Sequence, residues 1–266
     1  MFRQSVEIME RALGPEDPLV AMVLGKLGGL LIDTGRFVEA EQVLWRALTI
    51  RKLRHPLDHP ALPAALGQLA AAYIHQGRYA EAEPLFRRAL FLQEKSLGSE
   101  HIEVAASLND VAVIGMMSGR YPEAERLMQR SIAIAEKQLG PKHPQMATYL
   151  ANLGALYQRQ GKSDKAEPLM REALAIRERC LGPEHPRVSE VLKYLAVVYV
   201  SQKRYQEAAP LLDRALAIQE KALGPAHPAL ADTVALYGPV LRKLKRKAEA
   251  EAMEKRVRSF AAKPPS

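Results

Sequence analysis

The sequence contains only one cysteine, Cys180, so it cannot form an intrachain disulfide. This low cysteine usage fits a protein of a reducing compartment, and we expect a cytoplasmic location. Aromatic residues make up only 6% of the chain, which favours helices over a β-sheet core. Long apolar runs are missing as well. No run reaches the ~18 apolar residues that span a bilayer, and residues 1–7 carry no signal-peptide pattern, so we expect no membrane partner.

Positive charge is concentrated at one end of the chain. The net charge is +8, and residues 242–266 carry six of these charges, so the rest of the chain is nearly neutral. A basic segment can bind acidic partners or nucleic acid. Here no aromatic residue is interleaved with the basic ones except Phe260, which fits an apolar helix stripe. The composition favours a solvated end of the chain over the alternative of nucleic-acid binding through residues 242–263.

Several columns of residues recur every 42 positions. The alanine column contains Ala40, Ala82, Ala124, Ala166, Ala208 and Ala250. The proline column, preceded by histidine in most copies, contains Pro18, Pro60, Pro144, Pro186 and Pro228. The glycine column, followed by Arg or Lys, contains Gly35, Gly77, Gly119 and Gly161. No insertion interrupts the register, so the period indicates a repeat architecture.

Each repeat unit predicts two helices. Proline suits the first helical turn, and glycine can adopt the left-handed conformation that ends a helix. Apolar residues follow helical spacing in both halves of the unit, and the alanine column lets the two helices approach closely. One hairpin cannot bury both of its faces, whereas stacked hairpins can. We therefore predict an all-α solenoid with helix hairpins at residues 18–53, 60–95, 102–137, 144–179, 186–221 and 228–260.

The two ends of this array differ. Residues 1–13 match the second helix of an upstream repeat whose first helix is absent. In the last helix Glu254 and Arg258 replace leucines of the preceding unit, which gives the polar face expected of a terminal cap. Residues 261–266 are predicted to be a flexible tail. The incomplete first repeat raises two alternatives: a sensor or oligomerisation arm of a larger multidomain signalling protein or enzyme, and self-association through this helix.

No constellation of residues points to catalysis. Five histidines share one repeat position, so helix layers of ~8–10 Å separate them, whereas zinc ligands must lie ~2 Å from one point. Cys180 falls at a variable position near a helix end, without an orienting acid. No phosphate-binding Gly-Lys-Ser/Thr motif is present. We expect a protein without enzymatic activity, metal or cofactor. The five histidines at the shared repeat position, named above as unsuited to bind one zinc ion, are His59, His101, His143, His185 and His227.

One face of the first helices is not used by the packing columns. It contains helix positions i, i+3, i+7, i+10 and i+11, which lie on one side of a helix. Small and apolar residues with a few polar side chains predominate there, which suits an extended or helical peptide. The alternative is that these small residues only allow the array to curve. The candidate binding residues are Ile74, Asn109, Met116, Met117, Thr148, Gln158, Arg159, Glu190 and Lys193.

The fourth unit carries a family resemblance most completely. It reads LANLGALY at 150–157, GK at 161–162, KAEPL at 165–169, ALAI at 173–176 and LGPEHP at 181–186. This pattern resembles the tetratricopeptide repeat, in the 42-residue form found in kinesin light chains and many bacterial proteins. The similarity extends over essentially the whole chain. Local departures are Arg54-His55-Pro56, Gly115 and Gly238-Pro239, and a helix kink is expected at the last of these.

The resemblance implies a right-handed superhelical solenoid of antiparallel helix hairpins. It also implies an interaction scaffold that binds a peptide or partner-protein segment in a concave groove lined by first helices. Asn152 lies where related repeats often use asparagine to hold a ligand backbone or carboxylate, so it joins the candidate binding residues. A repeated carboxylate clamp is not expected, because the rest of this column is Lys26, Gln68, Asp110, Tyr194 and Leu236.

Overall fold

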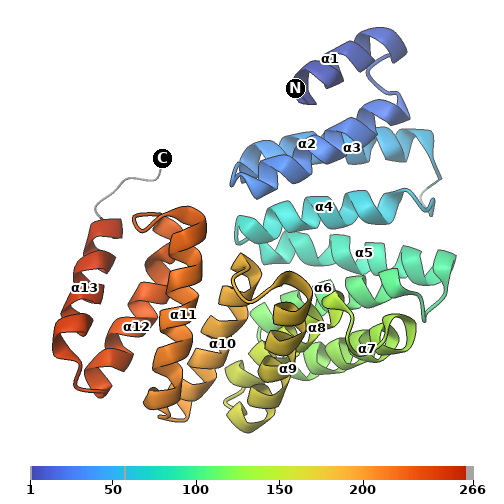
Figure 1. The fold of residues 1–266 in the computed structure, drawn as a ribbon. Coiled ribbons are helices and arrows are strands. Elements are labelled where there is room, and N and C mark those ends of the chain that lie inside the picture. Colours follow the sequence, from blue (N-terminus) through green and yellow to red (C-terminus); the bar gives the residue numbers. More distant parts are fainter. Residues whose placement is uncertain (1, 57, 262–266) are drawn as a thin grey trace. The chain divides into compact units, whose positions relative to one another are not determined.

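The computed structural model describes residues 2–56 and 58–261, and within these ranges it consists of helices without a β-strand (Figure 1). The predicted all-α fold class is confirmed. The predicted tail, apart from Ala261, lies outside the described residues. The helices are α1 (Phe2–Leu13), α2 (Pro18–Asp33), α3 (Phe37–Arg54), α4 (Leu62–His75), α5 (Tyr79–Leu97), α6 (Ile102–Met117), α7 (Tyr121–Leu139), α8 (Pro144–Arg159), α9 (Ser163–Leu181), α10 (Pro186–Ser201), α11 (Tyr205–Leu223), the 3₁₀ helix η1 (Pro228–Leu230), α12 (Ala231–Lys243) and α13 (Lys247–Ala261).

The helices divide into two compact units, residues 1–138 and residues 139–266. In the first unit α2 pairs with α3 and α4 with α5. In the second unit the pairs are α8 with α9, α10 with α11, and α12 with α13. Successive hairpins also stack within a unit, since α3 contacts α4 and α9 contacts α10. Each unit therefore shows the repeated hairpin packing of a helical solenoid.

The histidine column caps the first helices. The Nδ1 atom of His143 accepts the backbone N–H of Gln145 at 3.2 Å, and His143 has the extended backbone of an N-cap residue. In the first repeat Asp17 takes this place, and its Oδ1 lies 2.8 Å from the backbone nitrogen of Leu19. Four of the five histidines are therefore helix-start residues, as the repeat register predicts, whereas His59 accepts the Ala61 N–H in the turn before α4. The other caps of this kind are His101, His185 and His227.

Residues with positive φ end the first helices. In the first four repeats this residue is glycine, which has no Cβ to oppose the left-handed conformation. In the last two repeats the same position holds Lys203, with a φ of 61°, and Lys245, with a φ of 62°. A left-handed residue that carries a Cβ costs ~1–2 kcal/mol. These two turns are thus strained relative to those at Gly35, Gly77, Gly119 and Gly161, whose φ values are 73–77°.

Two first helices begin later than the proline column predicts. α4 begins at Leu62 instead of Pro60, because Pro63 has no N–H to donate to the carbonyl of His59. A turn replaces the missing helical bond, in which the Leu62 N–H donates to that carbonyl at 3.0 Å. In the sixth repeat η1 precedes α12. Helix α12 then continues through Pro239, so the predicted kink site does not interrupt the helix.

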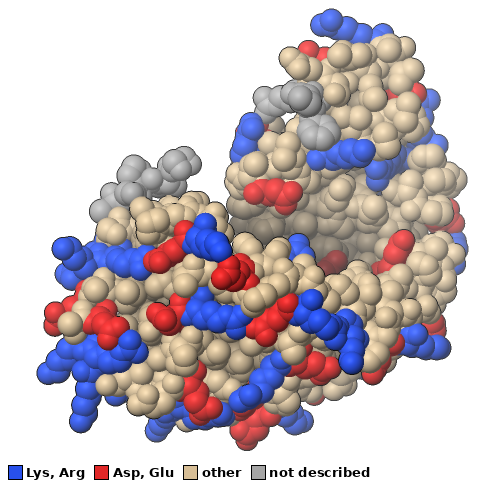
Figure 2. All heavy atoms as spheres, viewed as in Figure 1, with Lys and Arg blue, Asp and Glu red and all other residues tan. Residues whose placement is uncertain are grey.

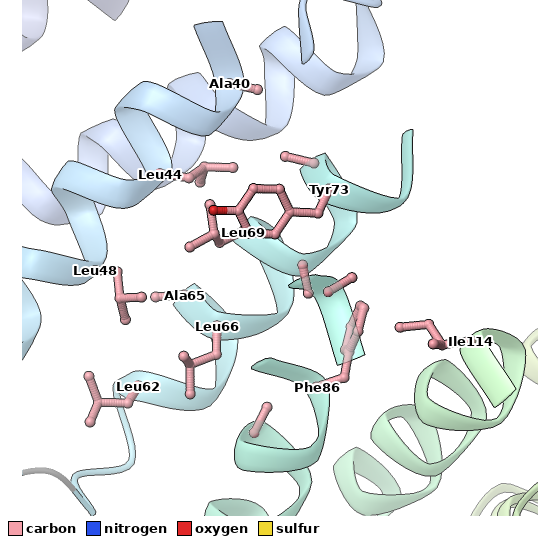
Figure 3. Close-up of a cluster of buried hydrophobic side chains, with 14 of the residues drawn as sticks. Ala40, Leu44, Leu48, Leu62, Ala65, Leu66, Leu69, Tyr73, Phe86 and Ile114 are labelled. Atoms are coloured by element: carbon pink, nitrogen blue, oxygen red, sulfur yellow. The ribbon is translucent and has the colours of Figure 1, made fainter. Parts of the chain in front are cut away.

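The alanine column is buried inside the hairpins, and all six of its members are at most 1% exposed. Larger side chains fill the space around them, and in Figure 3 Leu44 and Leu48 of α3 face the leucines of α4. Close approach also depends on Gly28 in α2. A Cβ added there would lie 2.4 Å from Cδ2 of Leu44, well inside van der Waals contact. Gly28 is therefore a packing residue of this hairpin.

Within each unit, ion pairs connect second helices of successive repeats. Arg204, which directly precedes α11, lies 2.6 Å from Glu167 in α9. Charged side chains of both signs accordingly lie next to one another on the visible face of the second unit (Figure 2). A further set of pairs, at 2.5–2.8 Å, is Glu10–Arg46, Glu94–Arg130, Glu178–Arg214 and Glu220–Arg256. The first pair shows that α1 packs on α3 as later second helices pack on one another.

Candidate functional site

The candidate binding surface is one side of the first helices. We call it the first-helix face and define it by the repeat positions of Thr148, Ala151, Asn152, Ala155, Gln158 and Arg159. In the first unit this face lies on α2, α4 and α6, and in the second unit on α8, α10 and α12. Because the same positions recur in every first helix, each unit presents its own copy of the surface.

In the first unit the predicted residues differ in accessibility. Met117 is 41% exposed at the end of α6, so a ligand can contact it directly. Ile74 is half-buried and packs partly against the core. Asn109 and Met116 are buried, with only 6% and 7% of their surface exposed. A ligand reaches these two side chains only after the surrounding residues rearrange.

In the second unit the predicted residues are more accessible. Thr148 and Arg159 are exposed, while Asn152, Gln158 and Lys193 are half-buried. Gln158 and Glu190 already have partners within the chain. The side-chain oxygen Oε1 of Gln158 accepts from the Ser163 hydroxyl at 3.1 Å. Glu190 pairs with Arg177 at 2.8 Å, so its carboxylate is engaged by the protein itself.

Two exposed large hydrophobic residues of this face are absent from the predicted set. Tyr194 on α10 is 51% exposed and occupies the repeat position of Asn152. Met22 on α2 is 41% exposed and occupies the position of Thr148. Both positions follow from the repeat register, because Tyr194 lies one repeat after Asn152 and Met22 lies three repeats before Thr148. Large exposed apolar side chains are frequent contact residues in interfaces, so both belong to the candidate site.

Asp110 is the acidic residue of the Asn152 column. It is half-buried on α6. Burial raises the pKa of its carboxyl to about 6, and a hydrogen bond from Asn109 opposes this effect only partly. A carboxyl with this pKa changes its charge near neutral pH. The first-helix face of the first unit therefore carries a charge that depends on pH.

Three arginines near the C-terminal end, Arg242, Arg246 and Arg256, are paired with acids. Arg242 lies 2.6 Å from Glu254, and Arg246 lies 2.6 Å from Glu249. Such pairing leaves less free positive charge for phosphates than the sequence suggests. Among residues 2–56 and 58–261, no group of three or more His, Cys, Asp or Glu side chains is placed to hold a metal ion. No helix in these ranges is long and apolar enough to cross a membrane.

Comparison with known proteins supports the repeat assignment. Family models described as tetratricopeptide repeat match residues 20–61, 62–114, 112–179, 152–221 and 187–263. None of the curated proteins matches the chain. Among solved structures, a protein of Podosopora anserina described as a kinesin light chain with nearly identical TPR-like repeats is 30% identical. The match has a TM-score of 0.62 and covers 77% of this chain and 97% of that one.

Two further structures share the fold. The BtubC (BKLC) protein of P. vanneervenii is 24% identical, with a TM-score of 0.66, and the match covers 87% of this chain and 92% of that one. The APC/C complex Cut9-Hcn1 contains a chain that is 15% identical, with a TM-score of 0.73 over 99% of this chain and 44% of that one. Solenoids of this kind are typically protein-interaction scaffolds. The family models cover most of the sequence, and the chain belongs to the tetratricopeptide repeat family.

Proposed function

We propose that the chain is a non-enzymatic scaffold that binds a peptide or partner-protein segment on its first-helix face. The observation that carries this proposal is the exposure of large apolar side chains at repeat positions that do not serve the stack. Met22 and Met117 in the first unit and Tyr194 in the second are 41–51% exposed. Their burial against a partner would gain ~25 cal/mol for each Å² of apolar surface.

Polar side chains accompany these apolar residues and supply specificity. Thr148 and Arg159 are exposed beside half-buried Asn152 on α8. Side chains of this kind hydrogen-bond a peptide backbone or its polar groups, while apolar contacts supply most of the affinity. The mixture supports a segment bound along the helices over a small molecule enclosed in a pocket. The absence of enzymatic activity and the cytoplasmic location stay predictions.

The test compares the first-helix face with the outer side of the second helices. Partners are captured with the full chain and mapped to the shortest binding peptide, whose affinity is then measured by fluorescence polarisation. The variant Met117→Asp/Tyr194→Asp changes the proposed face. The control Val38→Asp/Leu53→Asp changes two residues of α3 that are each 62% exposed.

We expect the first variant to weaken peptide binding by about tenfold or more, and the control to leave it within about twofold. Circular dichroism should show the same helix content in both variants. The proposal fails if the control variant loses binding while the first-helix variant retains it.

A further inference from the structure

Arg51 and Arg177 occupy the same repeat position in the two units. Arg51 lies in α3 and its Nη1 donates to the backbone carbonyl of Ala61 at 3.0 Å. Arg177 lies in α9 and its Nη1 donates to the carbonyl of Arg187, which is the repeat equivalent of Ala61. Both guanidinium groups are therefore held at the start of the following first helix by the same backbone contact.

The two arginines differ in their ionic partner. Nη1 of Arg177 also lies 2.8 Å from Oε2 of Glu190. The residue of the first unit that corresponds to Glu190 is Ala64, which has no carboxylate. Among the described residues, the contacts of Arg51 include no acidic side chain. Arg51 thus keeps a half-buried charge without the neutralising group that its counterpart has.

This arrangement is costly unless something else binds the guanidinium. Burial lowers the pKa of Arg51 from its usual value, which shows that its charged form loses solvation. Arginine nevertheless stays protonated in proteins. A guanidinium has five N–H donors, and one of the two terminal nitrogens of Arg51, Nη1, donates to the carbonyl of Ala61. The remaining donors are suited to a carboxylate, which can accept two parallel hydrogen bonds.

The neighbourhood of Arg51 contains a further polar group. A Cβ added to Gly25 of α2 would lie 3.9 Å from Nη2 of Arg51 and 3.1 Å from Oε1 of Gln68 on α4. The two polar side chains therefore approach the same point beside a residue that has no side chain. Gly25 and Gln68 both belong to the first-helix face, so this point adjoins the proposed binding surface.

We propose that Arg51 binds a carboxylate of the partner segment, and that the Gln68 amide turns so that its Nε2 donates to the same carboxylate. This carboxylate takes the place that Glu190 fills within the second unit. The inference rests on the proposed function only in assigning the carboxylate to a peptide. In the second unit, the Glu190 carboxylate occupies the equivalent site at Arg177, so an external carboxylate cannot bind there.

The test uses three small probes that differ in whether they carry a carboxylate and in where it lies. N-acetylglutamic acid α-amide has a side-chain carboxylate, N-acetylglutamine has a terminal carboxylate, and N-acetylglutamine amide is neutral. Each is titrated into the full chain, and the Nε–Hε NMR signals of Arg51 and Arg177 are followed. We expect the Arg51 signal to shift with at least one charged probe and not with the neutral one. Comparison of the two charged probes tells whether the bound group is an acidic side chain or a chain terminus.

Two variants sharpen this test. Arg51→Gln should weaken binding of the charged probe by about tenfold or more. Glu190→Ala should make the Arg177 signal respond to the same probe, to which it does not respond in the native chain. The proposal is wrong if the Arg51 signal does not move, if the neutral probe moves it equally, or if Arg177 stays silent after Glu190→Ala. The readout needs no peptide ligand, so it is independent of whether the first-helix face binds a partner segment.

Discussion

Nη1 of Arg78 lies 2.6 Å from the Oε2 atom of Glu41, and this contact connects two successive second helices, α5 and α3. Arg78 also binds Glu81 within its own helix turn. The same arrangement recurs at Arg204 with Glu167 and Glu207. Arg78 and Arg204 therefore each connect two repeats and also form part of a turn.

The first prediction concerns this connection. Arg78→Gln should lower the free energy of unfolding at neutral pH, because it removes an ion-pair partner of the partly buried Glu41 carboxylate. The matched control is Arg36→Gln. Arg36 holds the same repeat position, but its ion pair is with exposed Glu39 in its own turn, so the expected loss is clearly smaller than that of Arg78→Gln. Equal losses in both variants would contradict the role in joining repeats.

The same pair has a defined pH dependence. Burial tends to raise the pKa of Glu41, but hydrogen bonds from Gln76 and Arg78 outweigh this effect and hold the pKa below its ordinary value. A carboxyl with a depressed pKa contributes stability above its unfolded pKa, and this stability is lost as the pH falls through the folded value. The difference between the native chain and Arg78→Gln in urea unfolding should therefore shrink on acidification below roughly pH 4.5. A difference that grows in acid would contradict this assignment.

The second prediction concerns packing at Gly28. Gly28→Ala should lower the free energy of unfolding by ~1–3 kcal/mol, because the new methyl group would overlap Leu44 in the core. Gly29→Ala is the control. No atom lies within 4 Å of a Cβ placed there, so the better helix propensity of alanine should stabilise the chain by up to ~1 kcal/mol. Urea unfolding followed by circular dichroism measures both changes, and stabilisation by Gly28→Ala would refute the close-packing interpretation.

The third prediction concerns the strained turn at Lys203. Lys203→Gly should raise the midpoint of urea unfolding, with a gain of about 0.5–1 kcal/mol, since glycine adopts the positive φ without a Cβ clash. Lys26 is exposed in the middle of α2, where Lys26→Gly should instead cost ~1 kcal/mol. The opposite signs separate backbone strain from a general effect of removing a lysine. A loss of stability in Lys203→Gly would show that the lysine side chain matters more than the turn.

The fourth prediction concerns Asp110. A carboxyl whose folded pKa of about 6 exceeds its unfolded value takes up a proton on folding. It therefore destabilises the chain at neutral pH, and this cost disappears as the pH falls below the folded pKa. Asp110→Asn should stabilise the protein at neutral pH and have a smaller effect at roughly pH 4.5. The exposed Glu172→Gln serves as the control and should show no such trend. Destabilisation by Asp110→Asn at neutral pH would contradict the burial of an uncompensated charge.

Much of the fold was predictable because equivalent residues recur in the sequence. The 42-residue spacing of Ala40 and its equivalents identified a set of fully buried positions from the sequence alone. The start of α4 was not predictable from the proline column, since it depends on Pro63, which lies outside that column. The capping role of His143 also needed coordinates, because the imidazole must reach the backbone N–H of Gln145.

The candidate site was only partly predictable, for a physical reason. Helical periodicity tells which residues share one side of a helix, but their exposure depends on neighbouring helices. Asn109 and Met116 share a side with Met117, yet only Met117 is exposed. Likewise the partner of Glu190 is Arg177, which lies thirteen residues earlier on another helix. The spacing rules for a single helix cannot predict this pair.

Site-specific photo-crosslinking tests the central claim most directly. A benzophenone amino acid is placed singly at Met117 and Tyr194 on the first-helix face, and at Val38 and Phe91 on the second helices, all of which are exposed. The chain is irradiated with its mapped binding peptide, and crosslinked residues are identified by mass spectrometry. If the first-helix face is the binding surface, Met117 or Tyr194 should crosslink and the two control positions should not. Crosslinks confined to Val38 and Phe91 would place the partner on the opposite surface and contradict the proposed function.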